Sequence, residues 1–165
     1  MGFRSVNEIH HFDFQDAVIK SYKEKDDNVI FEVEALIVEP ENSQNENFTK
    51  SYADVTKITL KEAKLISAIK DGYKHYDAND KLLEEIPDTN LEKSSIETIL
   101  KNSKGSYLFA VDACKESTEE LFVFNFSIEI PSKEAYDTCP TVSYQIKFSF
   151  KEAVFNWERY LNKVQ

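Results

Sequence analysis

Large apolar side chains at every second position mark one stretch of the chain above the others. In residues 121–130, LFVFNFSIEI, Phe or Ile occupies every second position from Phe122 to Ile130. Successive side chains on a strand point to opposite faces, so the segment predicts a half-buried antiparallel strand with one apolar face. We expect the rest of the fold to be organised around this strand.

The same alternation predicts further strands on both sides of it. Pro131 ends the 121–130 strand, because proline has no N–H to donate to a ladder. We expect residues 107–113 to pair with this strand as a hairpin. In the last strand, Tyr144, Ile146, Phe148 and Phe150 are expected to face inward. The predicted strands are 10–23 (bent near residues 15–16), 29–38, 48–60, 107–113, 121–130 and 143–150.

Residues 61–76 fit two patterns. Ala63, Ile66 and Ile69 have helical spacing, whereas Leu65, Ser67 and Ile69 would share one face of a strand. We favour a strand, because residues 77–80 resemble a hairpin turn that leads to two leucines, although Ala, Lys and Glu at 61–64 favour a helix.

Two short helices are predicted. Ser94 and Glu97 fit a capping box at the start of a helix over about 94–103, and Gly105 follows its end. Near the C-terminus, Val154, Trp157 and Leu161 repeat at helical spacing. We therefore expect a short C-terminal helix against the sheet edge or barrel mouth.

The whole chain, 1–165, is predicted to be one mainly β domain, because 165 residues suit a single core. We expect an antiparallel β-barrel or β-sandwich of about 6–8 strands. Residues 39–47, EPENSQNEN, contain no hydrophobic side chain and predict a solvated loop. The alternative, a recognition loop, has no support in the sequence.

The net charge of −10 disfavours binding to nucleic acids and to anionic membrane surfaces. It suits solubility or a basic protein partner. No apolar run approaches the roughly 20 residues of a membrane span, and residues 1–12 do not resemble a secretory signal. The predicted location is the cytoplasm, where Cys114 and Cys139 would be reduced thiols.

Few residues suggest a metal site. His10 and His11 would point to opposite faces of a strand, and His75 is remote in sequence, so zinc is disfavoured. A calcium loop starting at Asp77 departs from the EF-hand pattern at three positions, and a hairpin turn explains it better.

Catalytic patterns are equally scarce. Neither cysteine lies in a recognised nucleophile signature, although a Cys/His pair remains an alternative. Glu32 and Glu34 would share one sheet face, as acid–base partners or as solvated surface carboxylates. Trp157 and its aromatic neighbours fit a core better than a pocket. The sequence therefore assigns no catalytic, cofactor-binding or metal-binding residue.

Two segments carry a loose resemblance. They are GYKHYD (72–77) followed by LLEEIPD (82–88), and IKF (146–148) leading to VFNWERYL (154–161). Together they resemble small uncharacterised bacterial mainly β proteins that end in a strand followed by a W-[DE]-x-[YF] segment. That resemblance implies a single β-rich domain and no known activity.

Three functions stay open. The first is a non-catalytic acidic binding protein with a basic protein partner, which we favour. The second is a carrier that holds an apolar small molecule inside a barrel. The third is a small hydrolase that uses carboxylates or a Cys/His pair.

Overall fold

The computed structural model describes residues 2–111, 120–131 and 141–164. Strands dominate these residues, and one 3-10 helix and one α-helix accompany them. In chain order the elements are β1 (Phe3–Val6), the 3-10 helix Ile9–His11, β2 (Phe12–Asp13), β3 (Val18–Lys25), β4 (Asn28–Glu34), β5 (Ile37–Val38), β6 (Ser51–Ala53), β7 (Thr56–Lys61), β8 (Lys64–Lys70), β9 (Tyr73–Tyr76), β10 (Leu82–Ile86), β11 (Thr89–Asn90), α1 (Lys93–Lys101), β12 (Tyr107–Val111), β13 (Phe122–Pro131), β14 (Thr141–Phe150), β15 (Glu152–Trp157) and β16 (Tyr160–Lys163).

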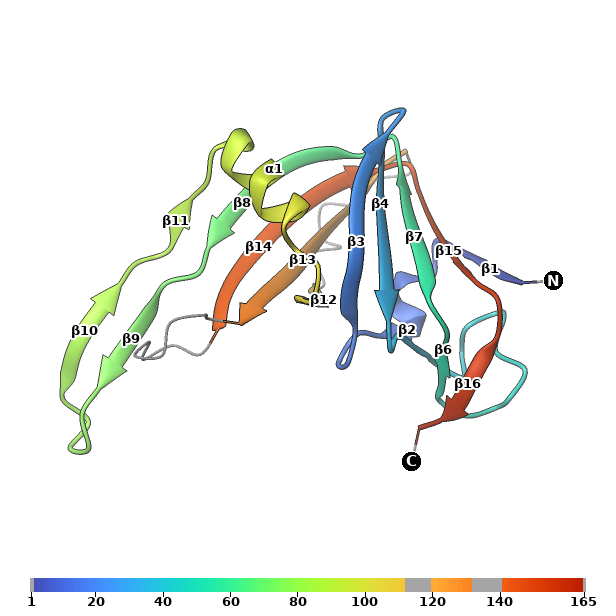
Figure 1. Ribbon diagram of the computed structural model, residues 1–165, viewed down its shortest axis with the longest axis horizontal. Helices are drawn as coiled ribbons and strands as arrows, with labels where there is room; N and C mark the ends of the chain where they lie inside the picture. The colour runs from blue at the N-terminus through green and yellow to red at the C-terminus, as the bar shows by residue number, and fades with distance from the viewer. Residues whose placement is uncertain (1, 112–119, 132–140, 165) are drawn as a thin grey trace.

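Ten strands form one antiparallel sheet in the order β1-β15-β7-β4-β3-β12-β13-β14-β8-β11. The sheet bends into an arch with two wings (Figure 1). The chain passes from one wing to the other at two places. β7 leads into β8 through Glu62 and Ala63, and β14 leads into β15 through Lys151. Strands that bend from one layer into the next make the corners of such folds. A four-stranded sheet, β16-β6-β5-β2, and the two-stranded β9–β10 ribbon complete the described structure.

Segment 121–130 is a strand in the middle of one wing, which confirms the central prediction from the sequence. β13 pairs with β12 on one side and with β14 on the other. Phe124, Phe126 and Ile128 lie in the hydrophobic core, and Phe122 and Ile130 pack against it at the two ends. The alternation therefore reports a real division between an apolar inner face and a more polar outer face.

The prediction of a mainly antiparallel β fold is confirmed. Of the two predicted architectures, barrel or sandwich, the barrel is wrong, because the described strands do not close the sheet. β1 and β11 are its two edges. The structure also has sixteen described strands rather than 6–8. Backbone breaks divide several of the predicted strands, and β1, β10, β11, β15 and β16 lie outside them. Ala35, with φ +58°, separates β4 from β5 inside the predicted strand 29–38. Residues 14–17 separate β2 from β3 inside the predicted strand 10–23.

The predicted C-terminal helix is also wrong, because residues 152–157 and 160–163 form β15 and β16. β15 lies between β1 and β7, so its backbone groups find partners on both sides. Ala153, Phe155 and Trp157 alternate along it and are all buried in the core. The prediction followed the helical spacing of Val154, Trp157 and Leu161. The two-residue pattern of Ala153, Phe155 and Trp157 runs through the same segment and was overlooked.

The remaining elements follow the sequence more closely. Residues 61–76 are strands β8 and β9, as favoured, and the internal helix is present as α1. α1 contributes Ile96 and Leu100 to the core. The predicted capping box is wrong, because the helix begins at Lys93, one residue before Ser94, and its N-cap Glu92 makes no side-chain cap hydrogen bond.

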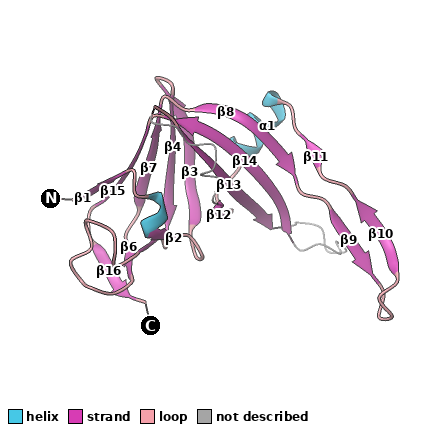
Figure 2. Cartoon of the chain, turned by 180° about the vertical axis from the view of Figure 1, so that it is seen from behind, coloured by secondary structure: helices cyan, strands magenta, loops and turns pink. Residues whose placement is uncertain are grey.

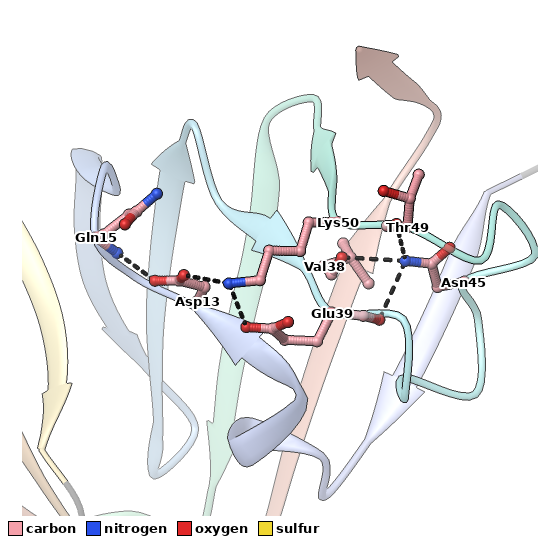
Figure 3. A network of polar contacts seen from close by, with 7 residues as sticks. All are labelled: Asp13, Gln15, Val38, Glu39, Asn45, Thr49 and Lys50. Atoms are coloured by element: carbon pink, nitrogen blue, oxygen red, sulfur yellow. Dashed lines mark hydrogen bonds and ion pairs between the residues drawn. The ribbon is translucent and has the colours of Figure 1, made fainter. Parts of the chain in front are cut away.

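The loop over residues 39–47 is not simply solvated, because two of its asparagines are buried. The side-chain amide of Asn45 donates to the carbonyl oxygens of Val38, Glu39 and Thr49 at 2.9–3.1 Å (Figure 3). Asn42 donates to the hydroxyl of Ser5 at 3.2 Å. Buried amides must satisfy their hydrogen-bonding groups, so these contacts hold the loop in one shape.

Glu8 ties this loop to the N-terminal segment. Its carboxylate accepts hydrogen bonds from the Ser5 hydroxyl and from both the hydroxyl and the backbone N–H of Ser43. Desolvation would raise the pKa of Glu8, but these hydrogen bonds together hold it below its ordinary value. The folded state therefore favours the ionised carboxylate.

Replacing Glu8 with Gln is expected to lower the free energy of unfolding by about 1 kcal/mol at pH 7, because the neutral amide is a weaker acceptor. The wild-type contribution is fully present above the unfolded-state pKa of Glu8. It is lost as pH falls through the lower folded-state pKa. Urea titrations at several acidic pH values should show that the difference between the two proteins shrinks toward low pH. A difference that is constant with pH would contradict this role.

Among the described residues, no helix combines the length and apolar composition that crossing a membrane requires.

Candidate functional site

The most distinctive surface feature is a hairpin that leaves the main sheet. We call residues 73–86 the arm; it consists of β9, the turn 77–81 and β10. Within the described residues, β9 and β10 pair only with each other, whereas β8 and β11, at the base of the same hairpin, belong to the ten-stranded sheet. Figures 1 and 2 both show the arm extending away from the body of the molecule.

A close backbone contact fixes the base of the arm. A Cβ atom at Gly72 would lie 1.9 Å from the carbonyl oxygen of Ile86 and 2.5 Å from the carbonyl carbon of Pro87. Only glycine allows the two strands to approach so closely. The Gly72 N–H donates to the Asp88 carboxylate at 2.7 Å, and the Asp71 N–H donates to the carbonyl of Ser143 at 2.8 Å. The arm is therefore anchored to both its own second strand and β14.

The turn at the far end is the predicted hairpin turn. The Asp77 carboxylate accepts hydrogen bonds from the backbone N–H groups of Asn79 and Lys81 at 2.8 and 2.9 Å. Asp80 has φ +59°, a left-handed conformation that Asp tolerates better than most residues. The turn thus uses Asp77 to close the hairpin, in agreement with the interpretation preferred over a calcium loop.

The arm exposes large apolar side chains. Tyr76 is 48% exposed, Leu82 44%, Leu83 58% and Ile86 40%. Tyr76 and Leu82 are cross-strand partners next to the turn, and a register shift at Leu83 places a further apolar residue beside them. Tyr76, Leu82 and Leu83 therefore form a cluster next to the turn, whereas Ile86 pairs with Tyr73 at the base of the arm. Clusters of this kind mark interaction surfaces more often than scattered single residues do.

The arm is also acidic. Residues 71–90 contain six Asp or Glu and two Lys, which gives a charge of −4 out of the total of −10. Lys74 lies 3.7 Å from Glu85 across the two strands, so one of the two lysines already has a partner. An apolar cluster surrounded by carboxylates is complementary to an apolar surface bordered by Lys and Arg.

A second candidate is a groove beside the N-terminal segment. It has a volume of about 480 Å³ and lies between residues 9–15 and strands β12 and β13. Asp13 and Glu39 line it, and both contact the Lys50 ammonium, at 3.2 and 3.4 Å (Figure 3). Four of its apolar lining residues, Ile9, Phe12, Phe14 and Phe124, are only 4–6% exposed. Phe109 and Ala110, which also line it, are partly exposed. The small cavity next to it measures about 80 Å³.

The histidines do not come together. His10 and His11 lie in the 3-10 helix, and the His10 ring packs 5.7 Å from that of Phe124. His75 lies on the arm, opposite Glu84. No group of three or more His, Cys, Asp or Glu in the described part of the chain is arranged to hold a metal ion.

The other candidates from the sequence are accounted for individually. Cys114 and Cys139 fall outside the described residues. Glu34 pairs with Lys20 at 3.1 Å on the sheet surface, and Trp157 is only 2% exposed in the core. The apolar cluster of the arm was not predicted from the sequence. Its only signal there is the Leu82-Leu83 pair between charged residues, which breaks the two-residue alternation.

No family model matches the chain, and no match was found among curated proteins or solved structures. The resemblance to small bacterial β proteins therefore stays a prediction.

Proposed function

We propose that this protein is a non-catalytic binding protein that engages a basic protein partner through the arm. The observation that carries the proposal is the cluster of Tyr76, Leu82 and Leu83, whose side chains are 44–58% exposed beside the turn of a hairpin outside the core. Covering exposed apolar side chains with a partner removes their surface from water, which makes the free energy of binding more favourable. The surrounding charge of −4 selects a partner of opposite sign.

A comparison of two variants tests the proposal. Leu82→Ser/Leu83→Ser removes the centre of the apolar cluster, and Ile66→Ser removes a comparably exposed side chain, 50% exposed, from β8. Proteins captured from the source lysate by the wild type at low salt are identified by mass spectrometry. Affinity is then measured with the purified partner by calorimetry.

The double variant is expected to bind at least about tenfold more weakly, because central apolar residues dominate interface energies. Ile66→Ser should bind as the wild type does, and higher salt should weaken binding to a basic partner. Either of two results would reject the proposal: no specific partner at low salt, or a partner that binds the double variant with wild-type affinity.

A second candidate function is the binding of an apolar small molecule in the groove beside residues 9–15. Its volume of about 480 Å³ falls within the range typical of ligand pockets. We rank it second because four of the groove's six apolar lining residues are almost fully covered. Titration with Nile red should give saturable fluorescence that Phe124→Ser abolishes if the groove binds such ligands. The hydrolase alternative has no comparable support, since both groove carboxylates are engaged by Lys50.

A further inference from the structure

Phe48 is the most exposed large hydrophobic residue that the structure describes, at 90%. Its backbone has φ +57°, a left-handed conformation that is rare for a bulky residue. The side chain therefore contributes almost nothing to the core while its backbone is strained. Strain of this kind persists only where the surroundings impose it, and it is found preferentially at functional positions.

The surroundings of Phe48 are indeed rigid. The side-chain oxygen of the buried Asn45 accepts a hydrogen bond from the backbone N–H of Asn47 at 2.9 Å. Its side-chain nitrogen donates one to the carbonyl oxygen of Thr49 at 2.9 Å. Asn45 therefore holds the residues on both sides of Phe48 (Figure 3 shows the contact with Thr49). Lys50, which follows, is held by Asp13 and Glu39. The loop presents the phenyl ring on a fixed support, and a preorganised side chain loses less entropy on binding.

An apolar hollow lies close to Phe48 along the same chain. It has a volume of about 390 Å³ and is lined by residues 34–35, 52–55 and 161–162. Two of its lining residues are exposed apolar side chains, Val55 at 41% and Leu161 at 54%. Tyr52 of this hollow is four residues from Phe48, so even a fully extended chain separates the two by no more than about 14 Å.

This proximity matters for self-association. In a two-fold symmetric dimer, a residue that contacts a site on the partner receives the same contact in return. A protruding ring and its receiving hollow must then lie on the same face of one chain, within one interface. Phe48 and the hollow beside β6 satisfy that condition, whereas the arm projects from the opposite side of the molecule in Figure 1.

The local charge also permits two copies to meet here. Residues 46–55 and 158–163 contain three acidic and three basic side chains, a net charge of zero in a chain of charge −10. The charged residues at the hollow have partners, since Asp54 lies 4.0 Å from Arg159 and Glu34 lies 3.1 Å from Lys20. By contrast, two copies of residues 71–90, each of charge −4, would repel each other.

We propose that the occupant of this hollow is Phe48 of a second copy of the chain, in a two-fold symmetric dimer. One ring and one hollow per chain make a small contact, so we expect a weak dimer that forms at roughly 0.1 mM protein. The dimer leaves both arms outside the contact. It would therefore present two partner-binding arms at once, although the proposal does not depend on the function of the arm.

Sedimentation velocity over about 0.01–1 mM protein tests the dimer. The wild-type sedimentation coefficient should rise with concentration, and Phe48→Asn and Leu161→Ser should each weaken association at least tenfold. Asn tolerates the left-handed backbone, so Phe48→Asn should melt no lower than the wild type, which separates loss of contact from loss of folding. The control Leu83→Ser, on the arm, should dimerise as the wild type does.

A cross-linking experiment locates the contact. A benzoylphenylalanine introduced at position 48 should, on irradiation, form an intermolecular link to the tryptic peptide 51–57 or 160–163. A wild type that stays monomeric to about 1 mM overturns the proposal. So does a dimer that Leu83→Ser disrupts and Phe48→Asn does not, or one whose cross-links fall elsewhere.

Discussion

Replacing Phe126 with alanine is expected to lower the free energy of unfolding by about 3–5 kcal/mol, the usual cost of removing a fully buried aromatic ring. Phe126 has no exposed surface, and its ring packs against those of Phe31, Phe124 and Phe148, with centroids 5.4–6.4 Å apart. These neighbours come from three strands, β4, β13 and β14, on the two wings of the arch. Truncation would therefore leave a cavity where the wings meet.

Phe48→Ala supplies the matched control, because it removes the same atoms from a ring that is 90% exposed. We expect it to change stability by no more than about 0.5 kcal/mol. Urea unfolding followed by the fluorescence of the single tryptophan, Trp157, would measure both variants. Equal effects of the two substitutions would contradict the placement of Phe126 at the centre of the core.

β13 could be predicted from its sequence for a simple physical reason. A strand with one face on the core and one toward polar surroundings tends to alternate, and segment 121–130 places Phe or Ile at every second position from Phe122 to Ile130. The same holds for β14, where Ile146, Phe148 and Phe150 are buried as predicted. Such patterns are local and depend little on which strands become neighbours.

The errors arise where the arrangement depends on distant partners. Whether segment 152–161 forms a helix or strands is decided by β1 and β7, which supply hydrogen bonds on both sides of β15. The closure of a barrel is decided by whether the two edge strands can reach each other, and the bends at residues 62–63 and 151 turn them into opposing wings instead. Neither condition is visible in the local pattern of side chains.

The candidate site was hidden for a related reason. The sequence predicted the hairpin around residues 77–80, and the structure confirms it. It could not predict that β8 would pair with β14 while β9, only three residues further, would leave the described sheet. Exposure of Leu82 and Leu83 follows from that departure. The buried Asn45 is a similar case, because only its three carbonyl acceptors distinguish it from a solvated loop residue.

Gly72→Ala is expected to have the largest effect on the arm. The added Cβ would lie 1.9 Å from the carbonyl oxygen of Ile86, so the strands at the base of the arm must separate. We expect the hydrogen bond from Gly72 to Asp88 to be lost and amide exchange in residues 73–86 to accelerate at least about tenfold, as in a locally opened segment. Exchange in β13 should remain at the wild-type rate, because the arm residues do not belong to the core.

Hydrogen–deuterium exchange followed by mass spectrometry resolves these two regions. Asp88→Ala is the companion variant, since it removes the acceptor of the 2.7 Å hydrogen bond without adding an atom between the strands. The Gly72 N–H can then bind water, so acceleration should be smaller than in Gly72→Ala. If Gly72→Ala left exchange in the arm unchanged, the close approach of the two strands would be wrong. If exchange rose equally in β13, the arm would unfold together with the core rather than as a separate segment. The presentation of Leu82 and Leu83 to a partner could then not be explained by an arm that is fixed only at its base.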